Sequence, residues 1–164
     1  MTLLLRNLQK AVSVNVPKLK QDVQSLRRIM HVQRFDVAVL CVDDNKIQEL
    51  NKMYRGVDKV TDVLSFPANE IQVPGKLPDP WSDLADLGDI FLGMPYIYNQ
   101  CVKDGTTIEA VLPAIITHGF CHLMGFDHEN KEQWLEMRAK EVSILEKFNK
   151  ITGNGSTPLA TSWS

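Results

Sequence analysis

The chain lacks both a long apolar run and a framework of cysteines. None of its apolar stretches approaches the roughly 20 residues that a membrane-spanning helix needs, so we expect no membrane partner. Its three cysteines, Cys41, Cys101 and Cys121, are odd in number and show no CxxC spacing, which argues against a disulfide-stapled secreted domain. We therefore expect a reducing intracellular compartment. The absence of acids before Asp22 leaves both the cytoplasm and the mitochondrial matrix open.

The composition is that of a folded globular protein. Hydrophobic residues make up 44% of the 164 residues and charged residues 23%, which excludes disorder over the whole chain. This length fits one domain with its own hydrophobic core. We expect that domain to span residues 1–152. The small and polar residues 153–164 predict a flexible C-terminal tail.

Charge is unevenly distributed along the chain. The net charge is −2. Residues 1–59 hold 11 Lys or Arg and 6 Asp or Glu, whereas residues 60–164 hold 7 and 14. This asymmetry permits a basic, nucleic-acid-binding face on an acidic protein.

Apolar periodicity and turn residues predict four strands and five helices. Strands interleaved with helices, followed by a helical half, favour an α/β fold of the α+β type, in which helices cover one mixed, mostly four-stranded sheet. In chain order we expect a strand over 2–7, a helix from Pro17, a strand over Phe35–Val42, a helix ending at Gly56, a strand over Asp62–Phe66, a loop over 68–86, a strand over Leu87–Leu92, and helices over Met94–Val102, from Thr106 to about Met124, and up to Gly153.

Some local features of these helices are predicted in more detail. Thr106-x-x-Glu109 resembles a capping box, and Pro113 implies either a later helix start or a kink. The second helix carries an apolar stripe that ends at Tyr54. The stripe expected on the last helix consists of Leu135, Ala139, Val142, Leu145 and Phe148.

Three of the four histidines lie within one short segment, HGFCHLMGFDH. His118 and His122 are four residues apart, so on a helix both imidazoles project from one face. Gly125 can end that helix in a left-handed conformation and return the chain to deliver His128. Three protein ligands leave one position open, which is typical of catalytic zinc. We predict one Zn²⁺ per chain at this site, on a helix of the C-terminal half.

Two neighbours of the histidines bear on the chemistry. Cys121 could supply a thiolate, but its helical angle favours packing. In zinc peptidases with the HExxH motif, a glutamate acts as general base, and here that position is Gly119. A metal can still lower the pKa of a bound water without it, so hydrolysis remains open as a reaction class.

The segment HGFCHLMGFDH resembles the signature of the YbeY family of metal-dependent, single-strand-specific endoribonucleases. Leu50-Asn51-x-x-Tyr54-Arg55, the segment TDVLSFP at 61–67 and Leu87-Gly88-Asp89-Ile90 are also similar, so the resemblance covers about residues 35–148. It implies a mixed α/β fold, maturation of ribosomal RNA and a role in small-subunit assembly and quality control. A small-subunit ribosomal protein or an assembly GTPase would then be a partner, besides single-stranded RNA.

The resemblance also implies that His118, His122 and His128 bind the metal and that Arg55 is catalytic. A guanidinium can neutralise the charge that a phosphodiester gains in the transition state. Thr61 and Ser65 are candidate substrate-binding residues, because their hydroxyls can donate to phosphate or sugar oxygens. The carboxylates considered for orienting the imidazoles are Asp62, Asp89 and Asp127.

Two other functions are compatible with the residues. One is a different zinc metallohydrolase, with a peptidase-like site that lacks its usual glutamate. The other is a ribosome-assembly factor whose zinc only braces the fold. The sequence leaves open the cleavage site, the nucleophile, the general base and the oligomeric state.

Overall fold

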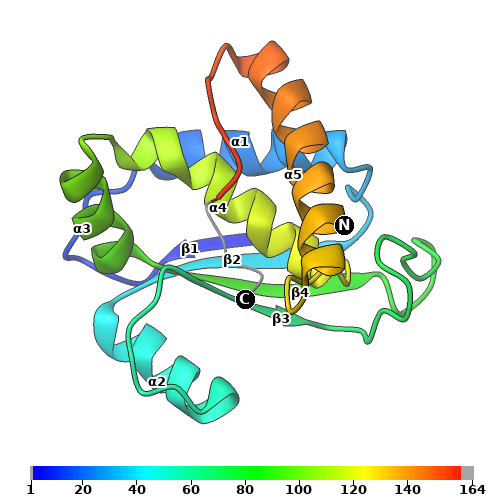
Figure 1. Ribbon diagram of the computed structural model, residues 1–164, viewed down its shortest axis with the longest axis horizontal. Coiled ribbons are helices and arrows are strands. Elements are labelled where there is room, and N and C mark those ends of the chain that lie inside the picture. The colour runs from blue at the N-terminus through cyan, green and yellow to red at the C-terminus, as the bar shows by residue number, and fades with distance from the viewer. Residues whose placement is uncertain (1, 160–164) are drawn as a thin grey trace.

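The computed structural model describes residues 2–159 as a four-stranded sheet with helices on both of its faces (Figure 1). The strand order is β1-β2-β4-β3. β1, β2 and β4 are parallel, and β3 pairs antiparallel with β4. The elements are β1 (Leu3–Asn7), α1 (Val16–Ile29), β2 (Asp36–Val42), α2 (Asp44–Arg55), β3 (Val63–Pro67), β4 (Asp86–Gly93), α3 (Met94–Asp104), α4 (Ile108–Leu123) and α5 (Lys131–Thr152).

The predicted fold class and order of elements are confirmed. Local signals account for much of this agreement. Asn15 caps α1 through Lys18 N–H, and proline stands in the first turn of that helix. Asp43 caps α2 through Lys46 N–H, and Gly56 ends it with φ +71°.

The helices divide into two groups. α1, α4 and α5 pack together over the larger core, which includes the buried Val23, Leu26 and Phe120. α2 lies on the opposite face of the sheet and closes a smaller core around Ile47 and Leu64 (Figure 1). The positive charge of residues 1–59 is therefore split between two faces, because α1 and α2 lie on opposite sides of the sheet.

β3 is an edge strand, and its register shows which backbone groups face outward. Asp62 C=O accepts from Gly93 N–H at 2.7 Å, and Ala68 N–H donates to Leu87 C=O at 3.0 Å. In an antiparallel pair, bonded residues alternate along the strand. The backbone groups of Val63 and Ser65 consequently turn to the open edge.

Two local predictions differ from the structure, and one of the two alternatives for Pro113 is excluded. The cap of α4 is Thr107, whose side chain accepts from Ala110 N–H, and not Thr106. The helix starts at Ile108 and runs through Pro113, so the start is not delayed. On α5, Leu145 and Phe148 of the predicted stripe are buried, but Leu135 is 52% exposed, and the rest of the buried face consists of Met137, Glu141 and Ile144.

Residues after α5 turn back along the molecule as far as they are described. Asn149 bonds the backbone of Ser156 through both ends of its amide, at 2.9 and 3.0 Å. Leu159 packs against the larger core. The flexibility expected for residues 153–164 stays a prediction, and its part over residues 160–164 lies outside the described residues. Among residues 2–159, no helix combines the length and apolarity that crossing a bilayer requires.

Candidate metal centre and RNA cleft

The three histidines of the motif meet at the C-terminal end of α4. His118 and His122 stand one turn apart on that helix, and Gly125, with φ +95°, redirects the chain after it. His128 then returns to the same point. One nitrogen from each ring lies within 4.8 Å of the other two, so the three side chains can share one ion.

Two of the imidazoles are held in a defined tautomer. His122 Nδ1 lies 3.0 Å from the carbonyl oxygen of Phe126, which can only accept, so this nitrogen carries the proton. His118 Nδ1 lies 2.7 Å from Glu141 Oε1 on α5, and the two side chains are 6% and 3% exposed. These bonds leave both Nε2 atoms unprotonated and free to ligate.

The two Nε2 atoms are 3.1 Å apart. Unprotonated nitrogens at this separation repel each other unless a cation lies between them. Tetrahedral zinc with bonds of about 2.0–2.1 Å would place two ligand nitrogens about 3.3 Å apart. Burial is the largest cause that lowers the pKa of His122 to about 4, and repulsion from a proton on either neighbouring histidine acts in the same direction, so His122 is neutral near pH 7. The donor set thus fits a metal ion.

The other candidates near the histidines have different roles. Cys121 is fully buried, and burial raises the pKa of its thiol, so it packs as a neutral side chain. The carboxylate of Asp62 accepts a hydrogen bond from the backbone N–H of Val63 at 2.7 Å. The carboxylate of Asp127 accepts one from the backbone N–H of His128 at 2.8 Å. Burial and the charge of Asp86 raise the pKa of Asp89, and no imidazole pairs with it. None of these three aspartates orients an imidazole ring.

Gly119 faces the sheet at close range. A Cβ at this position would lie 3.2 Å from Ser65 Oγ and from two carbons of Ile90. A glutamate could not extend toward the metal ligands without displacing those side chains. The glycine therefore allows α4 to approach β3 and β4 closely, and the position has no room for a peptidase base.

The histidines form one wall of a cleft of about 770 Å³. Arg55, the last residue of α2, lines the same cleft from the other side of edge strand β3. Its guanidinium is exposed and makes no hydrogen bond or ion pair with the described residues. It is the one Lys or Arg among the described residues that line the cleft, where Asp62, Asp127 and Glu129 are the acids.

Thr61 and Ser65, the candidate substrate-binding residues, also line this cleft. Thr61 Oγ1 donates to Asp62 at 3.3 Å. Ser65 Oγ has no hydrogen-bond partner among the described residues and lies beside Gly119. The structure thus brings together all six residues that the sequence singled out: the three histidines, Arg55, Thr61 and Ser65.

Glu141 is the functional residue that the sequence reasoning missed. It lies 23 positions from His118 and is one of several glutamates on α5. The sequence does contain a pattern that points to Glu141, because this residue falls at helical spacing among the apolar Met137, Ile144 and Phe148, which are buried. A carboxylate on an apolar face is rarely buried without a partner.

Comparisons with known proteins agree with this geometry. The family model "Endoribonuclease YbeY" matches residues 4–149. A human protein named endoribonuclease YbeY is 41% identical over 160 residues, covering 97% of this chain and 95% of the human protein. The protein of that name from Desulforamulus reducens is 38% identical over 152 residues, covering 90% of this chain and 97% of its own.

A solved structure supports the fold. The solution structure of TM1509 from Thermotoga maritima aligns with a TM-score of 0.55 at 23% identity, over 98% of this chain and 100% of that chain. The family match spans β1 to α5 and includes every residue of the three-histidine site. The chain belongs to the endoribonuclease YbeY family.

Proposed function

We propose that this protein is a zinc-dependent endoribonuclease that cuts single-stranded RNA, with ribosomal RNA as its target. Membership of an endoribonuclease family makes it an enzyme that hydrolyses RNA. The proposed metal-dependent cleavage rests on one observation. Three convergent imidazoles and an arginine without a partner among the described residues line the same cleft. A metal ligand set and a free guanidinium are what phosphodiester hydrolysis requires.

Zinc is the metal that the donor set favours. Three neutral imidazoles without a carboxylate or thiolate suit Zn²⁺, and three protein ligands leave room for water or substrate. His118, His122 and His128 would hold one ion per chain, with Glu141 and the carbonyl of Phe126 fixing the first two rings. When bound, the ion supplies Lewis-acid activation of water near neutral pH.

Arg55 acts on the scissile phosphate. Its side chain is not engaged elsewhere, so both arms of the guanidinium can donate to non-bridging phosphate oxygens. These hydrogen bonds strengthen as negative charge builds up in the transition state. A lone cation among acidic neighbours also concentrates the attraction for RNA at one point of the cleft.

The hydroxyl groups of β3 position the rest of the nucleotide. Ser65 Oγ is free to donate to a phosphate or ribose oxygen, and the backbone of Ser65 faces the same open edge. Thr61 contributes less to substrate binding than Ser65, because its hydroxyl already donates to Asp62. Both are therefore assigned to substrate binding and not to catalysis.

In this proposal the enzyme matures ribosomal RNA during assembly of the small ribosomal subunit. A small-subunit ribosomal protein or an assembly GTPase would be its partner and would deliver the substrate. The compartment that we propose is reducing, either the cytoplasm or the mitochondrial matrix. All three cysteines are free and buried, which fits such a compartment.

The decisive test compares Arg55→Ala with Lys52→Ala. Lys52 lies three residues earlier on α2, is exposed and does not line the cleft, so the control removes the same charge from the same helix. We expect Arg55→Ala to lower kcat on single-stranded RNA by at least about a hundredfold, the size of losing one transition-state donor. Zinc content and Tm should stay at the wild-type values.

Three outcomes would contradict the proposal. Undiminished cleavage by Arg55→Ala would remove the arginine from the reaction. A wild-type protein that binds RNA and zinc without cleaving would favour the rival role of a zinc-braced assembly factor. Zinc-dependent cleavage of unstructured proteins would restore the peptidase-like alternative.

A further inference from the structure

Tyr54 is placed unusually for an aromatic residue on an apolar helix stripe. Ile47 and Leu50 of the same stripe are 0% and 8% exposed, whereas Tyr54 is 63% exposed. It immediately precedes Arg55 and lines the same cleft as the three histidines. The side chain thus leaves the small core and presents its ring to the cleft that the three histidines also line.

The exposed ring is held in place by two further aromatic residues. Its centroid lies 5.1 Å from that of Phe66 on β3, at an interplanar angle of 63°. Phe66 in turn meets Phe91 on β4 at 5.6 Å and 78°. In such edge contacts one ring supports another without covering both faces of either. The Tyr54 ring is consequently fixed in orientation while most of it faces solvent.

We propose that Tyr54, supported by Phe66, is a stacking platform for one unpaired base of the RNA substrate. Neighbouring residues on a helix diverge by about 100°, so Arg55 and Tyr54 address different parts of a strand. Arg55 takes a phosphate, and Tyr54 takes the base of an adjacent nucleotide. This subsite rests on the proposed function, and in it the Tyr54 ring is the group that contacts the nucleobase.

The platform gives a physical reason for single-strand specificity. Proteins that bind single-stranded RNA stack unstacked bases on aromatic side chains, which any base can satisfy through its π-face. In a duplex both faces of a base are already covered by its neighbours. A paired strand can offer its phosphates to Arg55 but cannot offer a free face to Tyr54.

The test uses zinc-loaded protein and a single-stranded oligoribonucleotide carrying 2-aminopurine, whose fluorescence is quenched by stacking. We expect Tyr54→Ala to raise KM by about five- to a hundredfold, the range of losing one base–aromatic stack. kcat should change much less than KM, and the quenching on binding should be lost. Tyr54→Phe, which keeps the ring, should restore KM to within about threefold of wild type.

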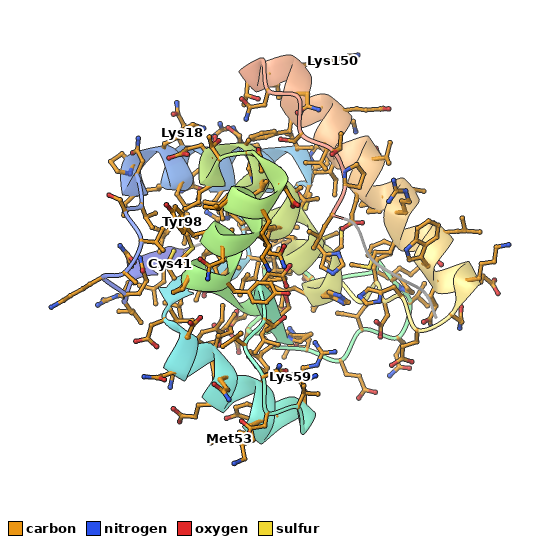
Figure 2. The ribbon with its side chains drawn as sticks, turned by 60° about the vertical axis from the view of Figure 1, so that its left-hand side comes forward. Lys18, Cys41, Met53, Lys59, Tyr98 and Lys150 are labelled. Atoms are coloured by element: carbon orange, nitrogen blue, oxygen red, sulfur yellow. The ribbon has the colours of Figure 1, made fainter. Side chains whose placement is uncertain are left out.

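The matched control is Tyr98→Ala. Tyr98 is 48% exposed on α3 and does not line the cleft. Figure 2 shows it well apart from Met53 and Lys59, which mark the end of α2 and the loop after it. This control should leave KM and quenching unchanged.

An abasic nucleotide, moved along the oligonucleotide, locates the stacked base. At one position it should raise KM for the wild type and leave KM for Tyr54→Ala unchanged. An unaltered KM and unaltered quenching in Tyr54→Ala would overturn the platform, as would a Tyr54→Phe variant as weak as Tyr54→Ala. If the wild type failed to cleave RNA, the proposed function would fall. The fluorescence would still report separately on the base stack.

Discussion

Replacing Glu141 by glutamine should weaken zinc binding with little change to the fold. The carboxylate accepts a 2.7 Å hydrogen bond from His118 Nδ1, and both side chains are almost fully buried. Glutamine has the same shape, but its amide is neutral and can present an N–H to the ring in place of oxygen. The charge that favours the correct tautomer of His118 is then lost.

The size of the effect follows from this buried bond. Hydrogen bonds to charged groups contribute about 1.5–3 kcal/mol, roughly twice the value for neutral pairs. Losing the charge but keeping an acceptor should therefore remove about half of this free energy, which corresponds to a loss of about three- to tenfold in zinc affinity. Glu141→Ala removes the bond altogether and should approach the hundredfold that a lost orienting partner can cost.

The assay is competition for zinc between the protein and a chromogenic chelator, together with Tm in the presence and absence of zinc. Glu146→Gln is the control, because it makes the same change at an exposed position of α5. Glu141→Gln should bind zinc about three- to tenfold more weakly and gain less in Tm from zinc, whereas Glu146→Gln should match wild type. Equal zinc affinity in Glu141→Gln and wild type would refute the assigned role.

Two further predictions concern α4, the helix that carries Gly119 and His122. Gly119→Ala should lower the free energy of unfolding by about 1–2 kcal/mol in urea denaturation, because the overpacking cost of a Cβ at 3.2 Å from Ser65 Oγ and Ile90 exceeds the roughly 1 kcal/mol that alanine gains in helix propensity; unchanged or raised stability would show that the helix can move away freely. In the metal-free protein, the pKa of His122 is lowered to about 4 in the folded state, so the unfolded state binds more protons below its own pKa of about 6.5. Stability should therefore fall as pH drops from about 6.5 to about 4, and His122→Gln should flatten this part of the profile; an equally steep profile in that variant would contradict the assignment.

Much of the fold was predictable because its signals are local. Asp43 and Gly56 bound α2 by capping chemistry that neighbouring residues reveal. His118 and His122 share a face because of the helical repeat, and Gly125 supplies the turn that returns His128. These features need only a few consecutive residues, so the sequence alone specifies them.

Other features depend on contacts between distant segments. Glu141 meets His118 only because α5 packs against α4, and of the predicted α5 stripe Leu145 and Phe148 are buried whereas Leu135 is exposed. The cap of α4 at Thr107 was also missed, because the adjacent Thr106 and Thr107 are nearly equal candidates for an N-cap from the local sequence. Tyr54 continues the apolar stripe of α2, but the helix ends at the cleft and the ring is exposed there, which the spacing alone does not indicate.

The central claim is that the three histidines hold the metal that makes this protein a nuclease. The most direct measurement is elemental analysis of the purified chain, paired with cleavage of single-stranded RNA before chelation, after chelation and after zinc is restored. We predict one zinc per chain, loss of cleavage on chelation and its return with zinc. Cleavage that persists in metal-free protein, or full zinc occupancy after His118, His122 and His128 are all replaced by alanine, would contradict the claim.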